Sequence, residues 1–231
     1  MRSESWSSNV RLATKAPVAD TLPPMIDKPF VQLVESLASK TPTPGGGAAA
    51  ALAACMGAGL LLMVVRFSRG RKGNEARDGL LADVELLLDK HLQLLMPMAE
   101  RDCKSFDLVS CAYKLPKDND QQKGIRERAV QEAMFGAMVV PEEVLCMVRD
   151  VFVAASGVIE CVGKNIASDL ASGAALLIAA AEGAHLNVRI NAVYLTNREQ
   201  ANKALDRARA VRQEIQMHQL AIVAAVEKML L

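Results

Sequence analysis

Asp102 is the residue in this sequence best placed for acid–base chemistry. It follows Pro97 by about one helical turn and shares a helical face with Phe106, between two apolar stretches. An aspartate on the same face as core residues is either paired with a cation or part of a site, because an unpaired buried carboxylate is costly. Arg101 and Lys104 are the nearby cations, so a solvated face, an ordinary ion pair and a functional carboxylate all remain open.

A second feature is a glycine run that precedes the most apolar part of the chain. Residues 41–47 read Thr-Pro-Thr-Pro-Gly-Gly-Gly, and Gly45, Gly46 and Gly47 leave their backbone N–H groups unshielded at a predicted helix N-terminus. Such an end carries a positive partial charge and suits an anion or the polar edge of a ligand. A tight turn that needs close packing is the other interpretation. The run is neither a Walker A loop, since no Lys-Ser/Thr pair follows, nor a dinucleotide fingerprint, since no strand precedes it.

Two carboxamides lie one helical turn apart near the end of another apolar segment. Asn187 and Asn191, beside His185 and Arg189, could bind the donor–acceptor edge of a heterocycle. Hydrogen bonds between helices would use the same side chains.

A basic run follows the apolar helix. Its members are Arg66, Arg69, Arg71 and Lys72. A solvated surface is the ordinary interpretation, but near the glycine run these cations could bind a carboxylate-rich ligand.

The composition indicates that helices position these residues. Hydrophobic residues make up 51% of the 231 residues and aromatic residues only 3%, so the apolar content is mainly Ala, Leu, Val and Met. Helix formers dominate, and alternating β-branched runs are scarce. We therefore predict an all-α fold, a bundle of six or more helices around a central, buried helix rich in small residues. That helix includes the charge-free stretch 48–65.

Proline, glycine and capping residues predict where the helices begin and end. We expect Asp27 to cap the first helix, Pro97 to kink or break the helix over 75–114, and Pro141 to break the helix that begins near 121. A further helix is expected over 151–161. Ser168 or Asp169 should cap the helix that runs to about 195, and a capping box over 196–199 should open the last helix.

Several classes of function are disfavoured. The net charge of +1 calls for neither nucleic acid nor an anionic membrane. No Cys-x-x-Cys or His-x-x-x-His spacing predicts a metal site. A membrane span over 48–65 is the alternative to the buried central helix. Residues 1–25 are expected to form a flexible polar tail without a secretory signal, and 26–231 a single domain, so we expect a cytoplasmic protein.

Taken in order, these segments resemble the cyclodeaminase/cyclohydrolase family of folate enzymes. The resemblance covers about 30–230. It rests on the glycine run and the Ala-rich helix after it, the Gly-Arg-Lys turn at 70–72, Asp102 with Phe106, Leu-Pro-Lys at 115–117, Ser-Asp at 168–169 and Asn-Val-Arg-Ile-Asn at 187–191. Three segments depart from the family pattern. Gly163-Lys164-Asn165 has an extra residue between Gly and Asn, and Gly73-Asn74 stands where an aromatic residue often follows the basic turn. The extension before Ile26 has no counterpart in the pattern.

The resemblance implies an all-α homodimer with a tetrahydrofolate derivative as substrate and no further cofactor. It implies that Asp102 is the catalytic acid–base residue and that the three glycines let the pterin or its linker approach the backbone. Asn187, Asn191 and Asp169 would hold the polar edge of the ligand. Arg71, Lys72 and Lys117 would bind the glutamate tail.

Three activities follow from this resemblance. The preferred one is hydrolysis of the methenyl bridge of 5,10-methenyltetrahydrofolate to formyltetrahydrofolate. The first alternative is cyclodeamination of formiminotetrahydrofolate with release of ammonia, and the second is a helical dimer that binds folate without turnover. No residue of the sequence separates the two reactions.

Overall fold

The computed structural model describes residues 25–231, and within that range the chain forms seven α-helices, four short 3-10 turns and no strand. The all-α prediction is confirmed. The expected tail over 1–25 lies outside the described residues except for Met25, which is buried in the first 3-10 turn, Met25–Asp27. The α-helices are α1 (Phe30–Ala38), α2 (Gly46–Ser68), α3 (Asp78–Leu95), α4 (Met98–Tyr113), α5 (Asp120–Ser156), α6 (Ala167–Val193) and α7 (Arg198–Leu230).

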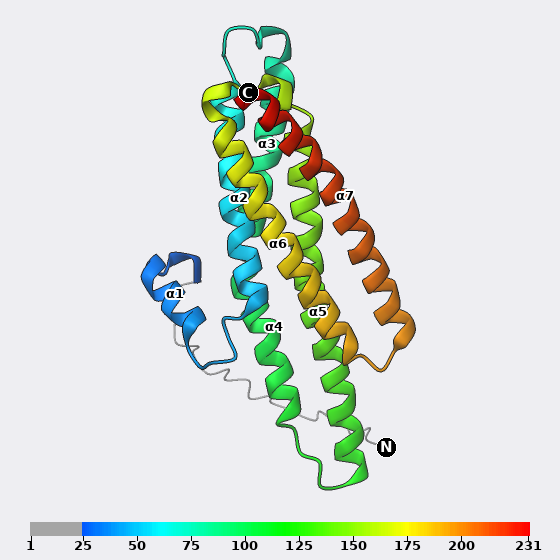
Figure 1. Ribbon diagram of the computed structural model, residues 1–231. Coiled ribbons are helices and arrows are strands. Elements are labelled where there is room, and N and C mark those ends of the chain that lie inside the picture. The colour runs from blue at the N-terminus through cyan, green and yellow to red at the C-terminus, as the bar shows by residue number, and fades with distance from the viewer. Residues whose placement is uncertain (1–24) are drawn as a thin grey trace, which may run out of the picture.

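The long helices form an elongated bundle, and α1 lies to one side of it (Figure 1). The central helix is α2, which packs chiefly against α6 and also contacts α3, α4 and α5. Gly57 of α2 and Gly173 of α6 allow the backbones of these two helices to approach each other closely. A Cβ on Gly57 would lie 2.9 Å from the Gly173 carbonyl oxygen. Small residues thus let the two central helices touch backbone to backbone, as the composition of 48–65 predicts.

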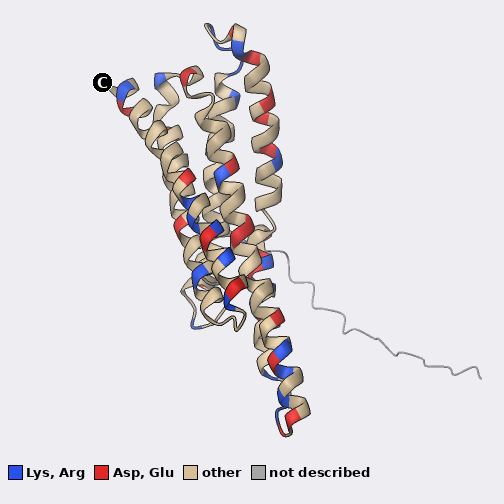
Figure 2. Cartoon of the chain, turned by 90° about the vertical axis from the view of Figure 1, so that its right-hand side faces the viewer, with Lys and Arg blue, Asp and Glu red and all other residues tan. Residues whose placement is uncertain are grey.

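Charged residues of both signs are interspersed along the helices in the side view of Figure 2. This arrangement agrees with the near-zero net charge of the chain. All five cysteines are free; burial raises the pKa of the Cys55 and Cys103 thiols to about 11.

Among residues 25–231, two helices meet the length and hydropathy criteria for a membrane span. They are α2, which contains the stretch 48–65, and the segment Lys164–Val193. In the bundle, 56% of the most apolar window of α2 and 44% of that of the second segment are buried against other helices. Burial of this kind is typical of core helices.

The two internal prolines behave differently. Pro97 separates α3 from α4, as predicted. Pro141, in contrast, does not break α5, which continues from Asp120 to Ser156. The separate helix expected over 151–161 does not form, because the first part of that segment is the end of α5. A proline inside a helix costs about 3 kcal/mol through its missing N–H and its ring. Pro141 is buried where α5 packs on its neighbours, and this packing offsets the cost.

The predicted caps are mostly displaced. The α1 helix begins at Phe30, after Pro29, without a side-chain cap from Asp27. The α6 helix begins at Ala167, before the expected caps Ser168 and Asp169. At α7 the cap is Asn197, whose side chain accepts a hydrogen bond from the Gln200 N–H at 3.0 Å, one residue after the expected capping position.

Candidate functional site

One pocket of about 270 Å³ lies where the N-terminus of α2 meets α4, α5 and α6. It gathers segments that are far apart in the sequence. The lining residues are Pro42, Thr43, Gly45, Gly46, Gly47, Asp102, Ser105, Phe106, Val109, Met134, Ala137, Asn187, Ile190, Asn191 and Tyr194. The glycine run, Asp102 and both carboxamides, which the sequence singles out separately, therefore form one site.

The glycine run brings the start of α2 directly onto α4 and α6. Gly45 is the N-cap residue and has an extended backbone, so α2 begins at Gly46. A Cβ on Gly47 would overlap the Asp102 carboxylate, with 2.6 Å left to Cγ. A Cβ on Gly46 would lie 3.4 Å from Asn187 Nδ2. The glycines thus serve close packing at a helix N-terminus, which is the second interpretation of the run.

Asp102 is half-buried in the wall of this pocket. Burial raises the pKa of its carboxyl above the usual value, and a hydrogen bond from the backbone N–H of Ala48 partly opposes the shift. Within residues 25–231 the Asp102 carboxylate forms no ion pair; Arg101 pairs instead with Glu143 at 2.6 Å, and Lys104 with Glu100 at 3.4 Å. The ion-pair interpretation of Asp102 is therefore wrong. A carboxylate with a raised pKa in a pocket is suited to proton transfer.

The two carboxamides lie on the same face of α6 and are held differently. Asn187 Nδ2 donates to the Gly183 carbonyl oxygen of its own helix at 2.8 Å. Asn191 Nδ2 donates to the Ala137 carbonyl oxygen of α5 at 2.9 Å, an interhelical bond. Each amide uses one N–H in this way, which leaves its oxygen and its second N–H for a ligand in the pocket.

The remaining wall is largely apolar. Phe106 lies one turn from Asp102 on α4, as predicted, and Val109 and Met134 continue this surface. Ser105 and Tyr194 also line the pocket, although neither is among the candidates predicted from the sequence. Their spacing was a usable signal, since Ser105 lies three residues after Asp102 and Tyr194 three residues after Asn191.

Three sequence-predicted residues lie at the opposite end of the bundle. Arg71 and Lys72 follow the C-terminus of α2, and the 23 residues of that helix span about 34 Å. Arg71 Nη1 there donates to the Cys161 carbonyl oxygen at 3.4 Å. Asp169 lies in the first turn of α6, about 27 Å along the helix from Asn187. Within one chain these residues do not line the pocket.

The departure at Gly163-Lys164-Asn165 belongs to that distant end as well. These residues form the turn before α6, and a Cβ on Gly163 would lie 3.0 Å from the Arg71 guanidinium carbon. Within one chain, the extra residue does not alter the pocket around Asp102.

Lys117 lies in the loop between α4 and α5. It lines a separate cavity of about 410 Å³ with Tyr113, Lys123 and Arg126. Arg126 stacks on the Tyr113 ring, 5.4 Å from its centroid, and Lys123 pairs with Asp120 at 2.9 Å. The structure therefore places Lys117 outside the Asp102 pocket.

Comparison with known proteins places the chain in a family. The sequence model of formiminotransferase-cyclodeaminase matches residues 29–210, which is most of the chain. The chain belongs to this family. It is 38% identical, over 74% of its length and 83% of the relative, to the methenyltetrahydrofolate cyclohydrolase of Methylorubrum extorquens.

Other family members are larger proteins or show similarity of fold. The formimidoyltransferase-cyclodeaminase of Gallus gallus is 28% identical over 88% of this chain, but the chain spans only 38% of that relative's length. A crystal structure of formiminotetrahydrofolate cyclodeaminase from Thermotoga maritima superimposes with a TM-score of 0.79, at 23% identity, covering 89% of this chain and 98% of that one. The helical bundle is thus the fold of the family.

Proposed function

We propose that this protein is a methenyltetrahydrofolate cyclohydrolase and that Asp102 is its catalytic acid–base residue. The observation that carries the proposal is the position of Asp102, a carboxylate without an ion-pair partner among the described residues and with a raised pKa, in the pocket formed by the glycine run and the two carboxamides. The relative from Methylorubrum extorquens, which is named for this reaction, supports the choice of substrate.

In the proposed reaction, water adds to the carbon that bridges two nitrogens of the cationic substrate. The ionised Asp102 carboxylate takes one proton as the water oxygen bonds to this carbon, so a neutral tetrahedral intermediate forms. One carbon–nitrogen bond then breaks, its electron pair stays on nitrogen, and this nitrogen takes the proton that Asp102 holds. The hydroxyl group loses its proton to solvent as the carbon becomes the formyl group. Overall, one water is consumed and one proton is released.

The other pocket residues bind and orient the substrate in this proposal. Asn187 and Asn191 have free amide oxygens and N–H groups for the polar edge of the pterin. Gly45, Gly46 and Gly47 let the ligand approach the start of α2. Before it takes the proton from water, the negative Asp102 carboxylate also stabilises the cationic bridge electrostatically.

Cyclodeamination is the alternative that the family itself favours, because the bifunctional relatives and the Thermotoga maritima structure carry that name. In that reaction Asp102 would protonate the departing nitrogen, and ammonia would be released as the ring closes. The same carboxylate serves either reaction because both pass through a tetrahedral carbon.

An absorbance assay distinguishes these activities. Purified protein is mixed with methenyltetrahydrofolate, and loss of the methenyl absorbance is followed against the spontaneous rate. We expect acceleration that the Asp102→Asn variant lacks. Ammonia release from formiminotetrahydrofolate without this acceleration would favour the cyclodeaminase. Neither activity, with folate binding retained, would favour the binding-only alternative.

A homodimer, which we also propose, would cover apolar surface that one chain leaves exposed. Phe30 and Val31 of α1 are 72% and 65% exposed, and Met56 and Phe67 on α2 are 50% and 63% exposed. Light scattering after size-exclusion chromatography tests this proposal; a monomeric mass at micromolar concentration would contradict it. We further propose a cytoplasmic protein, which fractionation of the source cells would test.

A further inference from the structure

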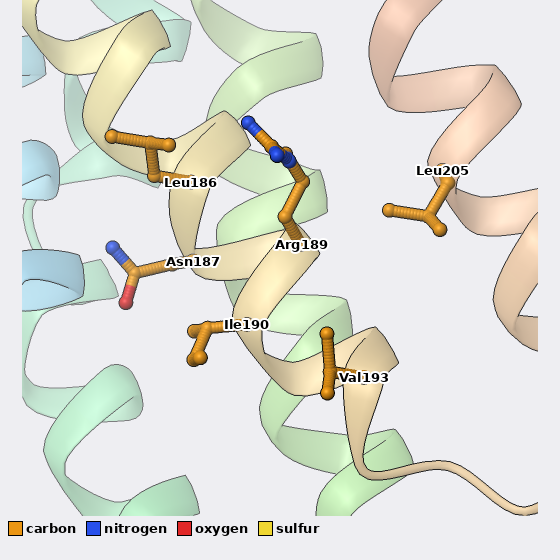
Figure 3. A pocket seen from close by; sticks show the side chains of 6 residues that line it. All are labelled: Leu186, Asn187, Arg189, Ile190, Val193 and Leu205. Atoms are coloured by element: carbon orange, nitrogen blue, oxygen red, sulfur yellow. The ribbon is translucent and has the colours of Figure 1, made fainter.

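A second, larger cavity adjoins the Asp102 pocket on the outer side of α6. This cavity measures about 590 Å³ and is lined by Leu186, Asn187, Arg189, Ile190, Val193 and Leu205 (Figure 3). Asn187 and Ile190 line both cavities, so the two lie next to each other on α6. At 270 Å³ the Asp102 pocket alone is below the range of roughly 300–1,000 Å³ that is usual for a drug-sized ligand. A ligand as long as a folate must therefore extend beyond it.

The surface between the two cavities is apolar. Around α6, the side chains follow the angular order Asn187, Ile190, Leu186, Val193, Arg189, because successive residues are rotated by about 100°. Leu186, Ile190 and Val193 are each more than half exposed. An exposed apolar strip thus runs from the carboxamide at the pocket to a guanidinium on the other side of the helix (Figure 3). An aromatic ring would be desolvated favourably on such a strip.

Arg189 is available to an anion at the far end of this strip. Within residues 25–231 it forms no ion pair, whereas Arg207 and Arg212 on the neighbouring α7 pair with Glu142 and Glu182 at 2.6 and 2.7 Å. The Arg189 charge also acts on the neighbouring His185: burial lowers the pKa of this imidazole most, the charges of Arg212 and Arg189 lower it further, and Glu182 raises it. A guanidinium in this setting is suited to bidentate binding of a carboxylate.

We propose that this second cavity binds the aminobenzoyl-glutamate part of the substrate, with the ring on Leu186 and Ile190 and a glutamate carboxylate on Arg189. The inference rests on the proposed function for the pterin end in the Asp102 pocket. It assigns tail recognition to Arg189, in place of the residues predicted from the sequence, Arg71, Lys72 and Lys117. Arg189 is a binding residue here and takes no part in the chemistry at the bridge carbon.

A pair of substrates tests this assignment. Methenyltetrahydrofolate and methenyltetrahydropteroate share the reacting bridge, but the pteroate lacks the glutamate. For Arg189→Gln we expect KM for methenyltetrahydrofolate to rise about tenfold, the lower limit for a lost charge-assisted hydrogen bond, with kcat within twofold of wild type. KM for the pteroate should not change. Arg189→Lys, which keeps the charge but not the planar fork, should give a smaller rise.

Matched variants make the result specific. Arg128→Gln removes the same charge from an exposed site on α5 and should behave as wild type. Equal KM values of wild type and Arg189→Gln for methenyltetrahydrofolate would overturn the proposal. So would a rise in KM in Lys117→Gln with none in Arg189→Gln, since the tail would then follow α4 and α5 to the other cavity.

Direct binding separates failure of this site from failure of the proposed function. If wild type hydrolyses neither substrate above the spontaneous rate, the cyclohydrolase proposal fails. Calorimetry with tetrahydrofolate and tetrahydropteroate then decides the tail site by itself. Tighter binding of tetrahydrofolate that Arg189→Gln abolishes supports the site, and equal affinities overturn it.

Discussion

Gly47 and Asp102 lie so close that a methyl group on Gly47 would overlap the carboxylate. The first turn of α2 therefore packs directly against the proposed catalytic group. The helix N-terminus favours the ionised carboxylate, whereas burial disfavours it. The balance of these two effects determines the protonation state of Asp102.

Gly47→Ala should displace the carboxylate and lower both activity and stability. We expect at least a tenfold loss of kcat, because the added Cβ must move Asp102 or the start of α2. Gly59→Ala is the control on the same helix, where a Cβ would meet nothing within 4 Å. It should keep full activity and gain about 0.5–1 kcal/mol of folding stability. Wild-type rates in Gly47→Ala would contradict the close approach.

Asp102→Asn should abolish activity and yet preserve the fold. Loss of a general base typically costs about 10²–10⁴-fold in rate. The neutral amide removes a charge whose burial is unfavourable, so the thermal midpoint should equal or exceed that of wild type. Asp107→Asn changes an exposed carboxylate of the same helix and should alter neither property. Thermal unfolding curves measure the stability of these variants, and rates with methenyltetrahydrofolate measure their activity. An active Asp102→Asn variant would exclude Asp102 from the mechanism.

Activity and stability should depend on pH in opposite directions. If the ionised carboxylate is the base, kcat/KM falls as pH falls through the raised pKa of Asp102, so the acid limb lies above the ordinary value of 3.8. The folded state binds the proton more tightly than the unfolded chain. Stability is therefore lost as pH rises from 3.8 through the raised pKa. Rates corrected for spontaneous hydrolysis and denaturant unfolding at each pH test both slopes, and Asp102→Asn should lack them.

Alanine variants of the two carboxamides should differ in their effects on substrate binding and on folding stability. Asn187→Ala removes a bond within α6 and should mainly raise KM. Asn191→Ala also removes the bond to the Ala137 carbonyl oxygen of α5 and should cost about 1 kcal/mol of stability in addition. Kinetics and urea unfolding of both variants measure this difference. Equal stability of the two variants would show that the interhelical bond contributes nothing.

Local rules predicted part of this fold correctly. The helical composition, the break at Pro97 and the small residues of α2 are properties of short segments, and the structure confirms them. The same rules failed at Pro141 and at the start of α6. Packing of α5 against several helices outweighs the proline penalty, and no local pattern records that packing.

The sequence by itself determined which residues were candidates for chemistry: Asp102, the glycine run and the two carboxamides. Only the tertiary structure decided that α2, α4 and α6 bring them into one pocket, and that Arg71, Lys72 and Asp169 lie at the other end of the bundle. The physical reason is the rigid length of the helices. Residues at opposite ends of one helix stay some 30 Å apart, whereas residues distant in sequence meet wherever helix ends coincide.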